Sequence, residues 1–483
     1  MKKWLEENRK NIGIMLIYLI CSFTILIFHE SWRDEAQAWL IARDLDLIGI
    51  INQMKYEGHF MLWYLILIPF AKLGFPYFTI KIVSWIIMSI AAWLILKKAP
   101  FNYITKILLI FSSPFIYWYI AVPRSYCIIP LAIILIAINH KNRNEKPLRY
   151  IMSIVLLANT HIIMYGLVGV LLLDFLIEGI KNRNKITKQQ NSKIIVSFGV
   201  GIILLIITIF PLIGSLNTNS IVKTQISIRS FEIEKVIDLI NLTMYLCTFK
   251  TVLPIILILL CSIYEFKYYT KDIIMIIASV LFQFIIYTFI YSTSEQRALT
   301  IIFIILLFIW IQKEKEEKGQ VYERKAITLF ISLLLIFNIM TGITYYIVEI
   351  MSSFSESKQV ANYIEKEVEP NSIFICTDMP ICSSVIPYLK DMKFWSLQSQ
   401  EYFTYVTWND LLYENYDFEQ FESIIKEKFK GMDNIYYLFS KESDMMLQEE
   451  LDNASGFSKI YESNGEKPEE RYIIYKIDID KLS

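Results

Sequence analysis

Long apolar runs separated by short polar breaks dominate the first 350 residues of the chain, beginning with NIGIMLIYLICSFTILIF at 11–28. A helix needs about 20 apolar residues to cross the hydrocarbon core of a bilayer, and a soluble protein does not need such runs repeated along its length. The pattern therefore predicts a polytopic α-helical membrane protein. Its transmembrane helices, about eleven in number, are expected at 12–28, 77–96, 102–121, 126–139, 150–160, 162–180, 193–213, 251–266, 272–291, 298–311 and 326–347.

The polar breaks fall into two sets that differ in charge. The breaks at 97–106, 140–149, 181–193, 267–271 and 313–325 are rich in Lys and Arg, and basic loops stay in the cytoplasm. This places the N-terminus inside, and the loop 29–76 and the residues after 350 outside. The apolar segment 59–75 is short, and a full crossing would bring Lys97 and Lys98 outside, so we expect it to dip into the membrane from the outer side.

The chain changes character after about residue 350. Residues 350–483 contain 25 acidic and 13 basic side chains, although the whole chain has no net charge. SIFICTD, KFWSL, NIYYLFS and RYIIYKID are typical of strands, and QVANYIEKEV, DFEQFESIIKEKF and KESDMMLQEEL are typical of helices. Alternation of the two predicts a small α/β domain over 351–483, following a membrane domain over 1–350. Cys376 and Cys382 are either free thiols or, in an extracytoplasmic tail, a disulfide.

Several ionisable or polar residues are predicted at the outer ends of the helices. Such groups near lipid are candidates for function because the hydrocarbon does not solvate them. They are Asp34, Glu35, Glu57, His59, Arg124, Tyr126, His161, Glu295 and Arg297.

Each of these residues also has a purely structural interpretation. Ser31 followed by Asp34 matches a capping box, in which the carboxylate only stabilises a helix start. The two histidines can each be satisfied by a backbone carbonyl. The arginines can extend along the membrane surface to reach water, and for Glu295 a solvated loop charge is the favoured interpretation. The predicted location of all of them on one side of the membrane is what favours a site.

The chemistry of this set suits transfer from a phosphate-activated donor. A pair of carboxylates acts as a general base or binds a divalent cation, while arginine and imidazolium groups bind phosphate. The cytoplasmic loops are too short to form a nucleotide-binding domain, and the α/β domain after residue 350 has neither GxGxxG nor GxxxxGK[ST]. A donor whose phosphate is linked to a membrane lipid requires neither a nucleotide-binding domain nor a nucleotide-binding motif.

Four stretches, taken in order, resemble the GT-C superfamily of membrane glycosyltransferases, nearest to the protein O-mannosyltransferases and lipid A aminoarabinose transferases. They are WRDEAQAWLIARDLDL, YEGHFMLWYLILIPFAKLGF, VPRSYCIIPLAIILI and ANTHIIMYGLVGVLLL, and they cover most of residues 1–180. The family pattern is an external DE pair, an HPPL or KPPL helix start, an ARP[DY] helix start and a TH turn. Here GHFML replaces HPPL, and Ser125-Tyr126 replaces Pro-Asp.

The resemblance implies a role for each matching residue. Asp34 corresponds to the external-loop carboxylate and Glu35 to its acidic neighbour, His59 to a residue near the lipid phosphate, Arg124 to the Arg of ARP[DY], and His161 to the TH turn. Asp34 is then expected to act as the general base of an inverting transfer. Arg124, His59 and Arg297 bind the departing polyprenyl phosphate, and Glu57 and Tyr126 complete the substrate site.

The expected partners are a polyprenyl-phosphate-linked sugar donor, a lipid, glycan or protein acceptor, and the membrane, with no nucleic acid. The sequence does not identify a cofactor, and a divalent cation bound by Asp34 and Glu35 is one candidate. The main alternative is a non-catalytic transporter of lipid-linked glycans. Transporters place ionisable residues near the membrane midplane and show repeated halves, and no such repeat is seen in this sequence. A glycan polymerase or ligase is a third interpretation.

Overall fold

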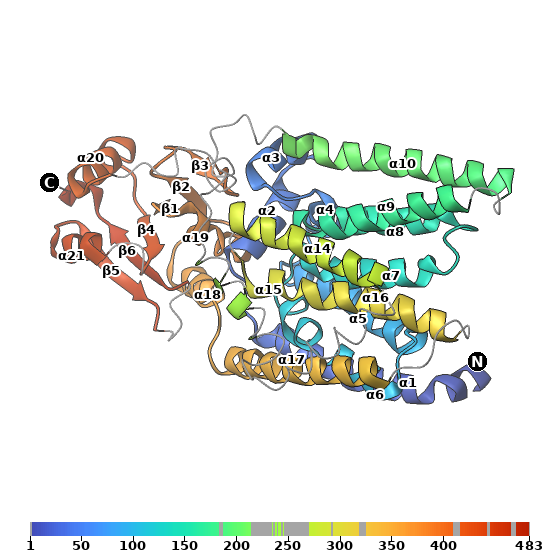
Figure 1. The fold of residues 1–483 in the computed structure, drawn as a ribbon. Helices are drawn as coiled ribbons and strands as arrows, with labels where there is room; N and C mark the ends of the chain where they lie inside the picture. The colour runs from blue at the N-terminus through green and yellow to red at the C-terminus, as the bar shows by residue number, and fades with distance from the viewer. Residues whose placement is uncertain are drawn as a thin grey trace.

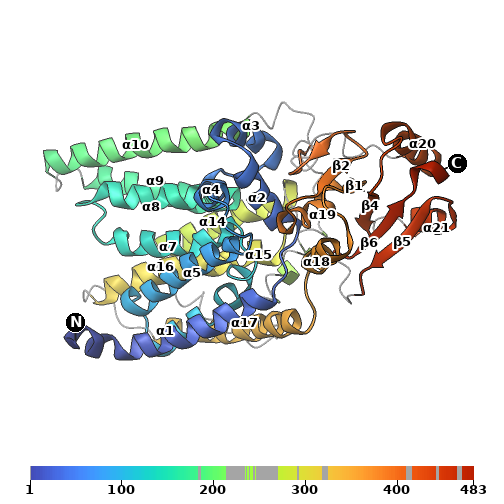
Figure 2. The ribbon, with the colours of Figure 1, turned by 180° about the vertical axis from the view of Figure 1, so that it is seen from behind.

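The computed structural model places a bundle of long helices at one end of the molecule and a sheet with short helices at the other (Figures 1 and 2). The N-terminus lies at the end of the bundle far from the sheet. The structure describes residues 2–182, 187–213, 270–290, 293–317, 325–408, 416–441, 445–464 and 470–482, together with isolated positions between 234 and 245. The predicted helix at 251–266 lies outside these residues.

Within these ranges, seven helices are long and apolar enough to cross a membrane. They are α1 (Lys2–Phe28), α5 (Thr79–Lys98), α9 (Tyr165–Lys181), α10 (Lys188–Ile213), α14 (Thr270–Phe289), α16 (Thr300–Glu317) and α17 (Lys325–Met351). Two further predicted spans are short apolar helices, α7 (Ile128–His140) and α8 (Pro147–Ala158). Large apolar side chains such as Phe210, which is 70% exposed, face outward from the bundle, as expected for a surface in contact with lipid.

The segment 102–121 is not the single helix that its apolar pattern predicts. Helix α6 (Tyr103–Ile110) ends early and is followed by a π-helical turn, η1 (Pro114–Trp118). Pro114 has no N–H to continue the helix, and the amide of Ser113 instead donates to Oδ1 of Asn338 on α17 (2.8 Å). The break is therefore held by a polar contact between two helices.

The predicted outer loop 29–76 folds into three short helices, α2 (Arg33–Asp44), α3 (Leu47–Glu57) and α4 (Leu62–Lys72). Asp46 caps α3 by accepting from the amide of Gly49 (2.7 Å), and Gly58 ends this helix with a φ of 65°, a conformation that glycine adopts without strain. Helix α4 has 11 residues and is about 16 Å long, which is too short to cross a hydrocarbon core of about 30 Å.

The C-terminal part contains a six-stranded mixed sheet in the order β3-β2-β1-β4-β6-β5. Strand β1 (Ile373–Cys376) pairs in parallel with β2 (Lys393–Ser396) and β4 (Ile435–Ser440), while β3 (Tyr402–Phe403), β5 (Phe457–Glu462) and β6 (Tyr472–Ile477) run antiparallel to their neighbours. Its helices are α18 (Ser357–Glu367), α19 (Met379–Ser383), α20 (Phe418–Lys428) and α21 (Met445–Asn453). The four predicted strands and three predicted helices are present, and β3, β5 and α19 are additional.

The two faces of the sheet have different cores. Phe421 of α20 packs on Tyr437 on the face away from the bundle. Phe374 stacks between Phe394 and Tyr436 on the other face, where α18 and α19 lie between the sheet and the bundle (Figure 1). Cys376 and Cys382 are free and buried, so the disulfide alternative is wrong.

Candidate functional site

A pocket of about 450 Å³ lies where the bundle meets the C-terminal part. Five of the nine candidate residues predicted from the sequence line it: Asp34, Glu57, His59, Arg124 and Arg297. The pocket is also lined by residues that were not predicted from the sequence: Arg33, Gln37, Tyr64, Asp378 and Trp408. The pocket is thus lined by four separate segments of the bundle and by two segments of the C-terminal part.

Asp34 faces Arg124 across this pocket. Its Oδ2 lies 2.8 Å from Nη1 of Arg124, and the two side chains are 29% and 16% exposed. The capping-box interpretation of Asp34 is wrong, because the residue before α2 is Trp32, not Ser31, and the helix has no side-chain cap of its own. The first turn of α2 therefore presents Asp34 to the pocket and to Arg124, which directly precedes the 3-10 helix η2 (Ser125–Cys127).

Glu35 does not reach the pocket. Its Oε1 lies 3.0 Å from Nε2 of His29, whose Nδ1 lies 3.1 Å from Oε1 of Glu349, and all three side chains are fully buried. Burial acts to lower the pKa of His29, but the two carboxylates outweigh burial and raise this pKa to about 9. Tyr117 completes the cluster by donating to Oε2 of Glu349 (2.8 Å). Glu35 thus belongs to a buried ion cluster that joins α1, α2 and α17.

The neighbouring carboxylates Asp34 and Glu35 therefore turn to different partners and do not form a common ligand set. In the part of the chain that the structure describes, no group of three or more His, Cys, Asp and Glu side chains is placed to hold a metal ion. The geometry gives the divalent-cation candidate no support.

Glu57 is held by a network of neutral donors. Its Oε1 accepts from Nε2 of Gln37 (2.7 Å) and of Gln53 (2.9 Å), and its Oε2 accepts from Tyr64 (3.3 Å). Burial raises the pKa of Glu57 to about 7, although these hydrogen bonds act to lower it. Both glutamines also donate to the carbonyl of Val406 in the C-terminal part (2.7 and 3.1 Å). Glu57 therefore links the pocket to the C-terminal part of the chain.

The two histidines and Tyr126 form an aromatic wall next to the arginines. Nδ1 of His59 donates to the carbonyl of Glu57 (2.7 Å), and the rings of His59 and His161 meet edge to face at 6.1 Å. His161 stacks on Tyr126 at 5.2 Å, and Tyr126 accepts from Nε of Arg297 (3.1 Å). Burial, and next Arg124, lower the pKa of His59 to about 4. His59 is thus neutral at pH 7, and the positive charge of this wall comes from the arginines.

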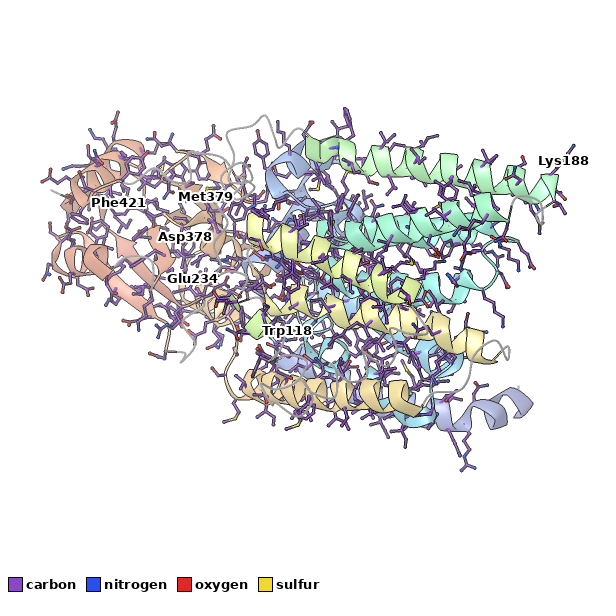
Figure 3. The ribbon with its side chains drawn as sticks, viewed as in Figure 1. Trp118, Lys188, Glu234, Asp378, Met379 and Phe421 are labelled. Atoms are coloured by element: carbon purple, nitrogen blue, oxygen red, sulfur yellow. The ribbon has the colours of Figure 1, made fainter. Side chains whose placement is uncertain are left out.

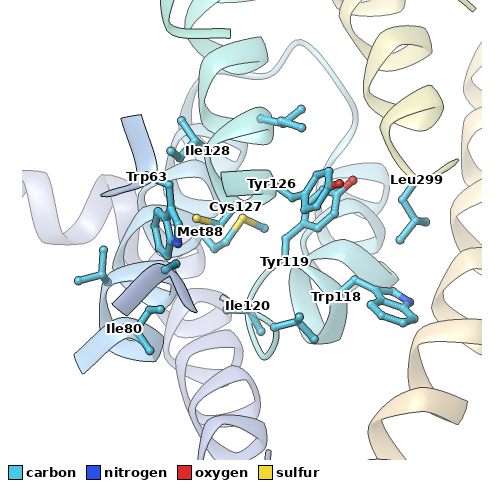
Figure 4. Packing of buried hydrophobic residues seen from close by; sticks show 14 of the residues in the cluster. Trp63, Ile80, Met88, Trp118, Tyr119, Ile120, Tyr126, Cys127, Ile128 and Leu299 are labelled. Atoms are coloured by element: carbon cyan, nitrogen blue, oxygen red, sulfur yellow. The ribbon is translucent and has the colours of Figure 1, made fainter. Parts of the chain in front are cut away.

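The wall is backed by close aromatic packing. The rings of Tyr119 and Tyr126 stack at 6.0 Å (Figure 4), and the Tyr119 hydroxyl donates to the carbonyl of Gln296 (2.7 Å). This contact fixes the short helix α15 (Glu295–Ala298), which carries Arg297. Tyr126 and His161 therefore orient pocket residues from behind.

The C-terminal part supplies one side of the pocket through Asp378, Pro380 and Trp408. Asp378 lies on the side of this part that faces the bundle (Figure 3), and its Oδ1 accepts from the amide of Ile381 (3.1 Å) at the start of α19. Burial raises the pKa of Asp378. No local motif marks these residues, because their role depends on how the two parts of the chain pack.

The pocket combines three arginines with three carboxylates, which suits a ligand that carries both a phosphate and hydroxyl groups. Comparison of the chain with protein-family models and with curated proteins finds no match. The functional inference therefore depends on the site itself and on the resemblance of the motifs quoted above.

Proposed function

We propose that this protein is an integral-membrane glycosyltransferase of the GT-C type. It moves a sugar from a polyprenyl-phosphate-linked donor to an acceptor hydroxyl at the outer face of the cell membrane. The observation that supports this most directly is the Asp34–Arg124 pair, with its 2.8 Å contact, inside a pocket that also contains Arg33 and Arg297. A carboxylate next to several arginines supplies both a proton acceptor and a binding site for a phosphate leaving group.

The arginines are proposed to bind the donor phosphate. In the free protein Arg124 is paired with Asp34, and a phosphate has more charge and more acceptor atoms than one carboxylate. Donor binding then draws Arg124 away from Asp34 and leaves that carboxylate able to accept a proton. His59, which is neutral, borders the phosphate site without adding charge to it.

The transfer step follows from this arrangement. The acceptor hydroxyl gives its proton to Asp34 as its oxygen bonds to the anomeric carbon. The bond from that carbon to the phosphate oxygen breaks at the same time, and the polyprenyl phosphate leaves with both electrons of the bond. Attack opposite the leaving group inverts the anomeric centre. Glu35 takes no part in this step, because it is buried in the ion cluster with His29.

The proposed orientation follows from the charge of the loops. Basic breaks at the end of the bundle far from the sheet favour a cytoplasmic position for that end, and we accordingly propose that the pocket and the C-terminal part lie outside. Nucleotide-activated sugars are made in the cytoplasm, so a site outside depends on a donor carried by the lipid.

The test is native mass spectrometry of the purified protein, comparing the wild type, Asp34→Asn and the matched control Asp44→Asn. Asp44 lies on the same helix but pairs with its neighbour Arg43 (2.6 Å) and does not line the pocket. We expect a co-purified polyprenyl phosphate in the wild type and in the control, and accumulation of the sugar-loaded lipid in Asp34→Asn, with transfer reduced at least a thousandfold. Bulk phospholipid alone in all three proteins, or full transfer by Asp34→Asn, contradicts the proposal.

A further inference from the structure

Helix α2, which carries Asp34, begins without a cap from its own sequence. Trp32 precedes the helix in an extended conformation, with φ −104° and ψ −178°, and no side chain near it in the sequence accepts from the first amides. The first four N–H groups of a helix have no partner within the helix, so a buried start such as this one needs an acceptor from elsewhere.

Glu470 of the C-terminal part provides that acceptor. Its Oε1 accepts from the backbone amide of Arg33, the first residue of α2, at 3.0 Å, although the two residues are 437 positions apart. Glu470 is only 1% exposed. A side-chain oxygen at this position satisfies the amide in the way that a helix cap does.

The carboxylate of Glu470 is itself held in place. Its Oε2 accepts from Ser355 (2.7 Å), just before α18, and from Tyr472 (3.3 Å) on β6. The backbone carbonyl of Glu470 accepts from the amide of Glu356 (3.2 Å). The cap is thus held by residues just before α18 and on β6 of the C-terminal part.

Two further contacts join α2 and the residues before it to the same part of the chain. Ser357 donates to the carbonyl of Ser31 (2.8 Å). The side-chain amide of Gln37 donates to the carbonyl of Val406 (2.7 Å) and accepts from its amide (2.9 Å). The C-terminal part therefore holds the first turn of α2 from both sides, and Asp34 lies in that turn.

We infer that Glu470 is a positioning residue of the transfer reaction, which holds Asp34 in the pocket by capping the helix on which it lies. This inference rests on the proposed function. A displacement of about 1 Å at a reacting group can reduce a rate by roughly a hundredfold, so the order of this first turn bears directly on proton transfer. Glu470 acts through the backbone of Arg33 and does not line the pocket.

The test uses the full-length protein in detergent, as wild type, Glu470→Ala, Glu470→Gln and the control Glu369→Ala. Glu369 is a hydrogen-bonded but exposed glutamate of the same part, which accepts from Asn434 (2.7 Å). Hydrogen exchange measures the order of the first turn of α2. Single-turnover release of polyprenyl phosphate, with a total lipid extract of the expressing cells as the probe, measures the reaction.

We expect exchange of amides 33–36 to rise about fivefold in Glu470→Ala, the usual effect of losing a helix cap. The turnover rate should fall at least tenfold while the half-saturating amount of extract changes less than twofold. Glu470→Gln keeps an oxygen that accepts from Arg33 and should restore both values. Unchanged exchange in folded Glu470→Ala, or a Glu470→Gln protein as slow as Glu470→Ala, overturns the inference. If exchange is faster in Glu470→Ala but the wild type shows no transfer, the proposed function and the positioning role of Glu470 are overturned, while the helix cap itself is confirmed.

Discussion

Asp34 and Glu35 are adjacent in the sequence, but their side chains have separate roles. Successive residues of an α-helix point about 100° apart, so one turn of α2 sends Asp34 into the pocket and Glu35 into the protein interior. Asp34 is 29% exposed beside Arg124, while Glu35 is fully buried beside His29. Two neighbouring carboxylates in a sequence are therefore weak evidence for a shared metal site when they lie in a helix.

The buried cluster predicts a large effect on stability. His29→Ala removes the positive partner of Glu35 and Glu349 and leaves the buried Glu35 without its ion-pair partner, which should cost about 3–5 kcal/mol. Arg43→Ala is the control, because the Arg43–Asp44 pair is partly exposed and should be worth less than about 1 kcal/mol. Thermal unfolding in detergent compares the two. Equal changes in Tm would contradict a structural role for the cluster.

The raised pKa of Glu57 predicts a dependence of stability on pH. Burial raises this pKa to about 7, so the folded state favours the protonated carboxyl. The resulting stabilisation is present below the unfolded pKa of about 4.3 and is lost as the pH rises through 7. Glu57→Gln has no such group. Its Tm relative to the wild type should therefore increase between pH 5 and pH 8, by an amount corresponding to about 3 kcal/mol or less. A constant difference across this range would contradict the raised pKa.

At the scale of elements, α17 packs closely on the π-helical turn that interrupts 102–121. A Cβ added to Gly342 of α17 would lie 2.7 Å from Cα of Ser113, whereas a Cβ on Gly199 of α10 meets nothing within 4 Å. The contact with backbone leaves no flexible side chain that could move aside. Gly342 is therefore required for the approach of these two elements.

This contact predicts opposite effects for two similar substitutions. Gly342→Ala should lower stability by about 1–3 kcal/mol because the backbone of the turn must shift. Gly199→Ala should be neutral or raise stability by up to about 1 kcal/mol, since alanine is the better helix former. Thermal unfolding of both variants checks the pair, and an unaffected Gly342→Ala would contradict the close packing.

The sequence was sufficient to predict elements whose pattern is local. Apolar length predicted the long helices, and alternating strand and helix patterns predicted most of the sheet. Pro114 was visible, but the asparagine that accepts the amide before it lies on a distant helix. Strand β5 was missed because FSKIYE mixes polar and apolar residues at the edge of the sheet.

The pocket residues, like the helices and strands, could be predicted only where their signal is local in the sequence. Charged residues near predicted helix ends identified five residues of the pocket. Gln37 and Gln53 were missed, because an amide side chain on a short helix carries no signal until its partners Glu57 and Val406 are known. Asp378 and Trp408 were missed because only the packing of the C-terminal part brings them to the pocket.

At the scale of the whole molecule, the bundle has two distinct ends. One end meets the C-terminal part and the pocket, and the other carries the loop after α7 and the start of α10 (Figures 1 and 3). These ends should lie on opposite sides of the membrane if the basic loops are cytoplasmic.

Single cysteines in a cysteine-free protein test this orientation in intact cells. Lys366→Cys, on the exposed side of α18, should react with a membrane-impermeant maleimide from outside. Lys141→Cys, in the loop after α7, should react only after the cells are permeabilised. The reverse pattern would place the pocket in the cytoplasm and contradict a requirement for a lipid-linked donor.

The cap that Glu470 places on α2 also has a consequence for biosynthesis. Arg33 is made 437 residues before Glu470, which at ordinary rates of translation is an interval of roughly 20–90 s. Throughout this interval the first turn of α2 lacks the acceptor for its leading amide. The protein therefore completes its site only when the C-terminal part has been made and Glu470 has reached the start of α2. A chain that stops before residue 470 has the residues of the pocket without the contact that orders them.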